Sequence, residues 1–272
     1  VLSAARARHR RVAVLVTVLC VLGIIPYISL QLKAISTSIH VLSGDIVQEH
    51  GLRGFLSDNT FYIAIALSVF IILFGTRSID ASEKHEGLVA AVAFESVIKL
   101  VAFIAVGIFV TYGIFNGFGD IFSQASKDPA LSRLYTLEPN TSYTSWFGLT
   151  ILSMLAIVFL PRQFQMGVVE NLQESHLKKA IWMFPLYLLV INIFVIPVAF
   201  GGKLILGSGV HADTYVLSLP LHYGHEILGL FTFIGGFSAA TSMIIVETIA
   251  LSTMMSNNIA TPILLKAKNF RP

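Results

Sequence analysis

Charged residues are scarce in this sequence. Only 12% of its 272 residues are Asp, Glu, Lys or Arg, while 55% are hydrophobic. Soluble domains carry about 25% charged residues, because their surfaces face water. A chain of this size cannot bury so much apolar surface inside itself. The composition therefore excludes an ordinary soluble domain and predicts that a lipid bilayer solvates the chain.

Cysteine and catalytic motifs are also nearly absent. Cys20 is the one cysteine and lies in an apolar stretch, which excludes an internal disulfide. The formal net charge is only +3, with basic residues in short clusters, so nucleic acid is not an expected partner. The sequence lacks a phosphate-binding glycine loop, paired cysteines and a His-Glu-x-x-His motif. The residues themselves therefore indicate no catalytic site and no cofactor.

Long apolar stretches dominate what remains. A transmembrane helix needs about 20 mostly apolar residues to cross the hydrocarbon layer. Six stretches fit this pattern, the second and fourth being short: Val12–Ile35, Thr60–Phe74, Gly87–Phe115, Ser145–Leu160, Ile181–Phe200 and Tyr223–Met255. The sequence thus predicts an all-α integral membrane protein with six transmembrane helices in a single domain, residues 1–272. We expect this domain to be incomplete at both ends, because no Met stands at the start.

The distribution of basic residues supports this count. With six spans, one side carries twelve Lys and Arg residues and the other carries Lys33, Arg53, Lys127, Arg133 and Lys203. Cytoplasmic loops are enriched in Lys and Arg. We therefore expect both ends of the chain to be cytoplasmic.

The connections between spans carry further expectations. On the outer side, Asp120 to Leu134 is predicted to form an amphipathic surface helix, and Gly201 to Pro220 a flexible connection rich in glycine. On the inner side, Glu170 to Lys179 is predicted to form a polar helix or turn. Pro161 is expected to end the fourth span just before Arg162.

Ionisable residues inside the spans are the first candidate site residues. Each costs about 2.5–3.5 kcal/mol at a helix centre on insertion scales, so it needs a partner or a function. Glu95 and Lys99 stand four residues apart in the third span, on one helix face. One interpretation is a self-neutralising structural pair. The other is that these two residues line a solute or ion path.

The last span holds a second set of candidates. Glu247 has no opposite charge within one turn, and the same stretch carries Thr241 and Ser242 among other small hydroxyl residues. Such residues allow close helix packing. Their oxygens also suit a cation, with the carboxylate as charge partner or proton carrier. Both interpretations remain open at this point.

Read in order, the spans resemble the sodium:solute symporter family. The similar segments are the Tyr27-x-x-x-Gln31-Leu32-x-Ala34 pattern of the first span, Ser82–Gly87, Pro161, and Ser238-Ala-Ala-Thr-Ser242. The resemblance implies the LeuT-type inverted-repeat fold, with core helices three to eight present here. It adds Gln31 to the candidates for the solute path.

Two segments resemble one branch more closely. His85 to Lys99 and Leu160 to Asn171 are similar to the symporter-like domains of bacterial hybrid sensor histidine kinases. This resemblance implies a downstream kinase module, a two-component phosphorelay and the bacterial inner membrane. The chain itself contains no phosphoacceptor or ATP-binding motif of a kinase.

The family's sodium site is only partly matched. Ser238 corresponds to the first hydroxyl of the site, but Ala239 replaces the second, and Glu83 keeps the acidic character of a family aspartate. The resemblance thus implies a degraded sodium site at Ser238 and Glu83. Sodium is the one ion that it suggests, and the lost oxygen predicts weak coupling.

These observations lead to three hypotheses. The first is a transporter-like membrane domain that senses or transports a small organic solute, such as an amino acid, as the N-terminal part of a sensor histidine kinase. The second is a sodium-coupled solute symporter without a kinase. The third is a membrane anchor without a solute site.

Overall fold

The computed structural model describes residues 2–44, 59–74, 86–135, 143–171, 173–207 and 209–266, and every regular element in these ranges is helical. The first half comprises α1 (Leu2–Ser43), α2 (Asn59–Phe74), α3 (Glu86–Ile108) with its π-helical end η2 (Phe109–Ile114), α4 (Phe118–Lys127), α5 (Pro129–Ser132) and the turn η3 (Arg133–Tyr135). The second half comprises α6 (Tyr143–Phe159), α7 (Pro161–Phe164), η4 (Gln165–Val169), α8 (Glu174–Asn192), α9 (Val195–Leu206), η5 (Ala212–Thr214), α10 (Tyr215–His222), α11 (Glu226–Met255), η6 (Ser256–Ala260) and α12 (Thr261–Lys266).

Four stretches of the described chain are long and apolar enough to cross a membrane: Arg10–Ser43, Val89–Ile114, Glu174–Leu206 and Glu226–Leu265. A fifth forms if α6 and the helix after it, bent by 46°, count as one broken span. The predicted all-α membrane class is therefore confirmed. The helix in the predicted second span, α2, has only 16 residues. The count of six and the LeuT-type arrangement stay predictions.

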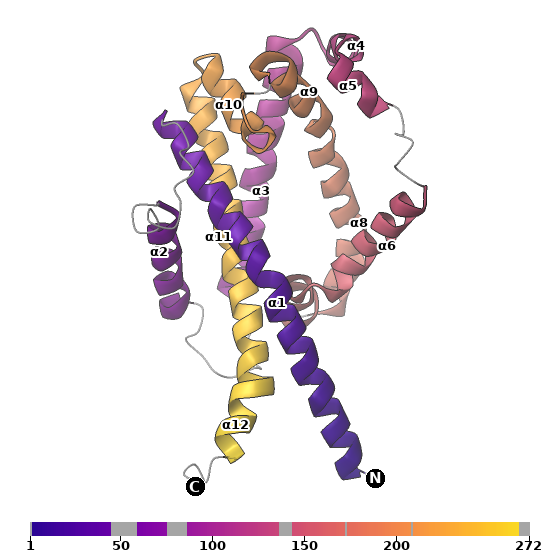
Figure 1. Ribbon diagram of the computed structural model, residues 1–272, viewed down its shortest axis with the longest axis vertical. Helices are drawn as coiled ribbons and strands as arrows, with labels where there is room; N and C mark the ends of the chain where they lie inside the picture. The colour runs from indigo at the N-terminus through magenta and orange to yellow at the C-terminus, as the bar shows by residue number, and fades with distance from the viewer. Residues whose placement is uncertain are drawn as a thin grey trace.

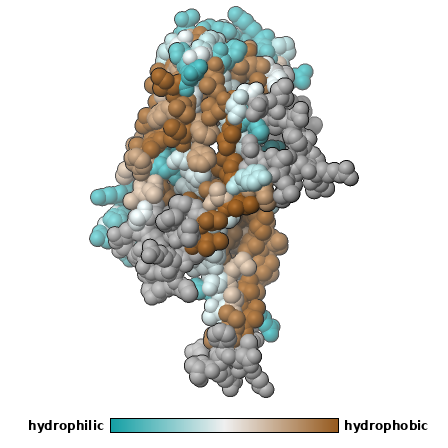
Figure 2. Space-filling view, turned by 90° about the vertical axis from the view of Figure 1, so that its left-hand side faces the viewer, coloured by the Kyte–Doolittle hydropathy of each residue, from teal (hydrophilic) through white to brown (hydrophobic). Residues whose placement is uncertain are grey.

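The surface of the molecule is largely apolar, as in a membrane protein, and some charged residues lie in the interior. Trp182 on α8 is 80% exposed and Ile227 on α11 is 88% exposed, while Glu247 in the interior is 2% exposed. In Figure 2 apolar side chains cover much of the visible face and the long lower shaft, and hydrophilic residues gather at the upper end. A folded chain in water does not expose apolar surface on this scale, so these faces contact lipid.

Helix α11 is the centre of the bundle. It packs against α3 along one side and against α1 along another, and α1 crosses it near mid-height (Figure 1). Close packing with α3 depends on Gly235, since a Cβ there would lie 3.0 Å from the Cβ of Ala102. The start of α1 and the end of α12 both lie at the lower end of the molecule (Figure 1).

Two segments at the upper end of the molecule differ from the structures predicted for them. The amphipathic segment from Asp120 to Leu134 is helical, but it is broken at Asp128, whose carboxylate accepts from the backbone N–H groups of Ala130 and Leu131 and so starts α5. At the start of α4, hydrogen bonds from the Gln124 side chain and the Asn116 backbone N–H lower the pKa of the Asp120 carboxyl. Local capping thus divides the predicted single helix into short pieces.

The predicted flexible connection from Gly201 to Pro220 is wrong. Gly201 and Gly202 are buried within α9, and a Cβ on Gly202 would clash with the ring of Tyr215 on α10. These glycines allow two helices to pack closely. The high glycine content of this segment therefore does not indicate flexibility. Tyr215 and Leu219 join residues of α3, α4 and α9 in one apolar cluster, which fixes α10 above the interior.

Candidate functional site

The broken span places a cation in the interior. Helix α6 ends at Phe159, Leu160 takes an extended conformation with ψ of 130°, and Pro161 begins α7. Proline forces this outcome, because it disfavours helical geometry at the preceding residue and suits the first position of a helix. The predicted stop at Pro161 is confirmed. The next residue, Arg162, then extends from α7 toward α11, which packs against this short helix.

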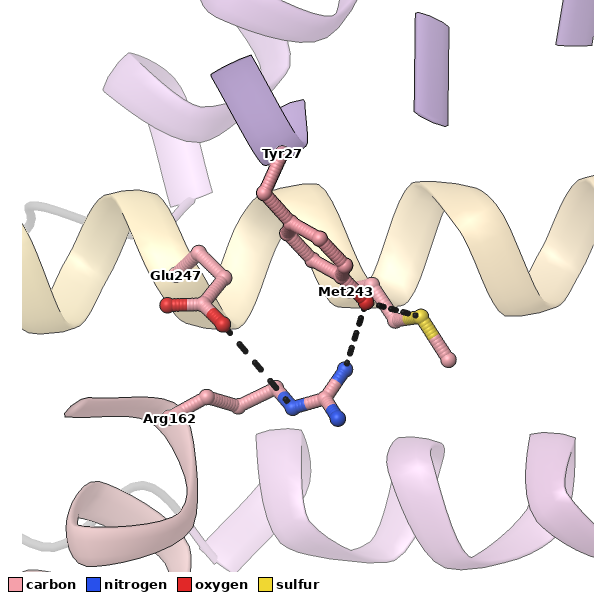
Figure 3. A network of polar contacts seen from close by, with 4 residues as sticks. All are labelled: Tyr27, Arg162, Met243 and Glu247. Carbon is pink, nitrogen blue, oxygen red and sulfur yellow. Dashed lines mark hydrogen bonds and ion pairs between the residues drawn. The ribbon is translucent and has the colours of Figure 1, made fainter. Parts of the chain in front are cut away.

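Arg162 joins three helices through one side chain (Figure 3). Its Nε lies 4.0 Å from Oε1 of Glu247 on α11. Its Nη1 donates to the hydroxyl of Tyr27 on α1 at 3.5 Å, and that hydroxyl donates to the sulfur of Met243 at 3.1 Å. The Glu247 side chain is only 3% exposed and that of Arg162 is 22% exposed. The contact is therefore a largely desolvated ion pair, in which each charge depends on the other.

Glu95 and Lys99 of α3 lie beside this pair. Glu95 is buried, the Ser242 hydroxyl of α11 faces its carboxyl group, and its charge interacts with those of both Lys99 and Arg162. Within the described chain Lys99 forms no ion pair or hydrogen bond. The predicted pair thus shares a helix face and an electrostatic environment, but the ion pair that forms here is Arg162–Glu247. We call Glu95, Lys99, Arg162 and Glu247 the charge cluster.

Each buried carboxylate of the charge cluster has an unsatisfied oxygen. Oε2 of Glu95 and Oε2 of Glu247 accept no hydrogen bond in the described structure. A buried acceptor without a partner costs about 1–3 kcal/mol, and more when it is charged. These oxygens are therefore places where a proton, a water molecule or a solute donor would stabilise the protein.

A cavity of about 210 Å³ opens on the upper side of the charge cluster. Helices α1, α3, α10 and α11 and the turn η5 line it. Lys99 contributes the one charge from within the spans, and Asp213 adds a carboxylate from η5. Of the charge cluster, Lys99 alone lines this cavity, together with residues of η5 and α10 near the upper end.

The remaining predicted residues lie along the same helices. Gln31 is half-buried on α1, one turn above Tyr27. The Thr241 hydroxyl donates to the backbone carbonyls of Phe237 and Ser238, so it is engaged by its own helix. Ser238 is half-buried on α11. Glu83 lies outside the described residues, so the sodium site that pairs it with Ser238 stays a prediction.

Sequence reasoning missed Arg162 as a partner of Glu247. The sequence places Arg162 just after Pro161, where the fourth span is expected to end, and therefore outside the membrane interior. Two features of the sequence could have indicated this pair. Glu247 has no opposite charge within one turn, and Arg162 follows a proline that breaks a helix. The hydrogen bond from Asn258 Nδ2 to the hydroxyl of fully buried Thr17 was also missed. Nothing in local spacing connects residues 241 positions apart.

Comparison with known proteins gives one informative similarity. The chain is 26% identical over 212 residues to the uncharacterized symporter YhjB of Bacillus subtilis (strain 168), and the alignment covers 76% of this chain. It covers only 39% of that relative, so the chain spans about two fifths of the relative's length. No protein-family model and no solved structure matches the chain. The chain is thus similar to a bacterial symporter, in agreement with its multi-pass membrane architecture.

Proposed function

We propose that this chain is a transporter-like membrane domain that senses or transports a small organic solute. The charge cluster carries the proposal, because two carboxylates and two cations from α3, α7 and α11 gather beside a broken span. Ionisable residues at membrane depth mark substrate and ion pathways, and transporters bind solutes at interrupted helices. A membrane anchor has no comparable need for four such charges.

A finer proposal places the chain in a signalling protein. In it, the domain is the N-terminal sensory part of a sensor histidine kinase in the bacterial inner membrane, with both ends cytoplasmic. The support is the resemblance of residues 85–99 and 160–171 to the symporter-like domains of such kinases, and the shared lower position of the start of α1 and the end of α12. A kinase module in the downstream reading frame is the expected result.

The second candidate is a sodium-coupled symporter without a kinase, which the similarity to a symporter favours. A reading frame that ends after a few more helices would support it and contradict the signalling proposal. Either way, the proposed solute-binding function of this domain is the same.

Sodium dependence is expected to be weak. The contacts of Gly235 with Ala102 and of Ser242 with Glu95 set the register of the antiparallel α3 and α11, and this register brings Lys99 to the level of Ser238. An ammonium group repels a cation bound at this level, and Ala239 offers no side-chain oxygen. We therefore propose that Lys99 provides the positive charge that sodium would bring.

The test is solute uptake by cells that express the full-length protein. We expect uptake of a labelled amino acid pool above that of cells carrying the empty vector. Replacing external sodium by choline should change uptake less than twofold, while Lys99→Ala with Ala239→Thr should increase sodium dependence. No uptake and no solute-dependent change in thermal stability would contradict the proposed function. A steep sodium requirement in the unmutated protein would contradict the role given to Lys99.

A further inference from the structure

The cavity above the charge cluster has the composition of a binding site. Its polar lining consists of Ser38 from α1, Lys99 from α3, Asp213 and Thr214 from η5, and Thr232 from α11. Phe103 and Phe233 add aromatic surface. Small-molecule sites typically combine apolar walls with a few polar groups that fix the orientation of the ligand. Opposite charges stand on different elements of this cavity, one within a span and one near the upper end.

Lys99 is the group that most needs a ligand. It is half-buried in the middle of a predicted span, and within the described chain it forms no ion pair or hydrogen bond. Glu95 compensates part of its charge from one turn below, but Glu95 also interacts with Arg162. An ammonium group has three donors, and a carboxylate is the acceptor that pairs with it most strongly.

We propose that this cavity binds a small zwitterionic amino acid, with its carboxylate at Lys99 and its ammonium group toward Asp213. This inference rests on the proposed function and names the substrate class for it. The two carboxylates and two cations of the charge cluster carry no net charge together. A zwitterion adds no net charge to the membrane interior, so this balance is kept when it binds. A simple anion would add an uncompensated charge there, which is costly in a low-dielectric environment.

The volume of the cavity sets the size of the ligand. A cavity needs only about 10–15 Å³ of this kind of volume to hold one water, so 210 Å³ leaves room for a small organic solute. An amino acid with about six to eight non-hydrogen atoms, such as alanine, serine or proline, is of this size.

Two substitutions test the site by independent means. Lys99→Gln removes the charge while keeping a polar side chain. Gly236→Leu adds a large apolar side chain without changing charge, at a residue that lines the cavity and where a Cβ meets no atom within 4 Å. The matched controls are Lys33→Gln, at an exposed lysine of α1, and Gly148→Leu, at an exposed glycine of α6 with equally open surroundings.

The experiment measures ligand affinity from the thermal stabilisation of the full-length protein in lipid nanodiscs. The probes are alanine, propionate, which lacks the amine, and ethylamine, which lacks the carboxylate. We expect alanine to bind most tightly, and Lys99→Gln and Gly236→Leu each to raise its Kd on the order of 10- to 100-fold. Asp213→Asn should weaken alanine binding while leaving propionate unchanged. The two controls should stay within twofold of the unmutated protein.

The outcomes separate the two proposals. Alanine binding that neither Lys99→Gln nor Gly236→Leu weakens would overturn the cavity assignment while leaving the solute-binding function in place. Propionate binding as tight as that of alanine would overturn the zwitterion assignment. If no amino acid, carboxylate or amine stabilises the protein and no solute is taken up, the proposed function fails together with this inference.

Discussion

Removing the Arg162 charge should destabilise the protein strongly. At 4.0 Å and an effective dielectric constant of about 20, the attraction between Arg162 and Glu247 is about 4 kcal/mol. The Glu247 side chain is 3% exposed, so water cannot compensate for a lost partner. Arg162→Met therefore strands a buried carboxylate, for which the usual cost is about 3–5 kcal/mol.

A second substitution should recover most of this loss. In the double variant Arg162→Met with Glu247→Gln, no charge is stranded, and we expect its stability to lie within about 1.5 kcal/mol of the unmutated protein. The double variant thus separates loss of the ion pair from the cost of an unpaired charge.

The assay is thermal unfolding of the full-length protein in a mild detergent. At about 2 °C per kcal/mol for a chain of this size, Arg162→Met should lower the apparent Tm by at least about 6 °C. The control is Tyr27→Phe, which removes the long hydrogen bond from Arg162 (3.5 Å) and the hydroxyl contact with the Met243 sulfur (3.1 Å) but leaves no charge without a partner. It should lower the apparent Tm by about 3 °C or less. If Arg162→Met lowers the Tm no more than Tyr27→Phe does, the ion pair does not hold the interior together as argued.

Three further predictions concern packing and topology. Thr17→Val should lower the apparent Tm by about 2–6 °C, because the Asn258 amide loses its buried acceptor; an unchanged Tm would mean that a water replaces it. Gly202→Ala should lower the free energy of unfolding by about 1–3 kcal/mol, because the added Cβ clashes with Tyr215. Denaturation measures this loss, with the same substitution at the exposed Gly148 of α6 as the control. An unchanged stability of Gly202→Ala would contradict the packing of α10 on α9. A cysteine at Lys178 should resist membrane-impermeant thiol reagents added to intact cells, and its labelling from outside would overturn the predicted orientation.

The membrane class and most helix positions were predictable from the sequence, because an apolar stretch of about 20 residues is typical of a transmembrane helix. The stop at Pro161 was also predictable, since proline acts on its immediate neighbours. The upper end was predicted less well. Gly201 and Gly202 read as a flexible connection, although they form a packing surface for Tyr215. A glycine that allows close contact and a glycine that allows a turn look the same in a single sequence.

The candidate site was predicted in its residues but not in its pairing. Glu95, Lys99 and Glu247 stood out because ionisable groups are expensive in a membrane. Their partners depend on how α3, α7 and α11 pack, and spacing along one helix reports only neighbours three or four residues away. The Arg162–Glu247 pair joins residues from two helices that meet only in the folded chain. The 210 Å³ cavity is likewise a property of packing.

Solvent access to Ser242 tests most directly whether the charge cluster serves a solute. The hydroxyl of Ser242 faces Glu95, so a cysteine at this position reports on the cluster from within. The measurement is the rate at which a small hydrophilic thiol reagent modifies Ser242→Cys in the full-length protein, in a background in which Cys20 and any cysteines outside this chain are replaced by serine. Ile234→Cys, on an exposed apolar face of α11, is the control for a thiol that faces lipid. We predict that Ser242→Cys reacts, that an amino acid present in excess slows the reaction at least fivefold, and that Ile234→Cys stays unreactive. A Ser242→Cys thiol that reacts no faster than Ile234→Cys, with or without amino acid, would show a dry and purely structural cluster and would contradict the account.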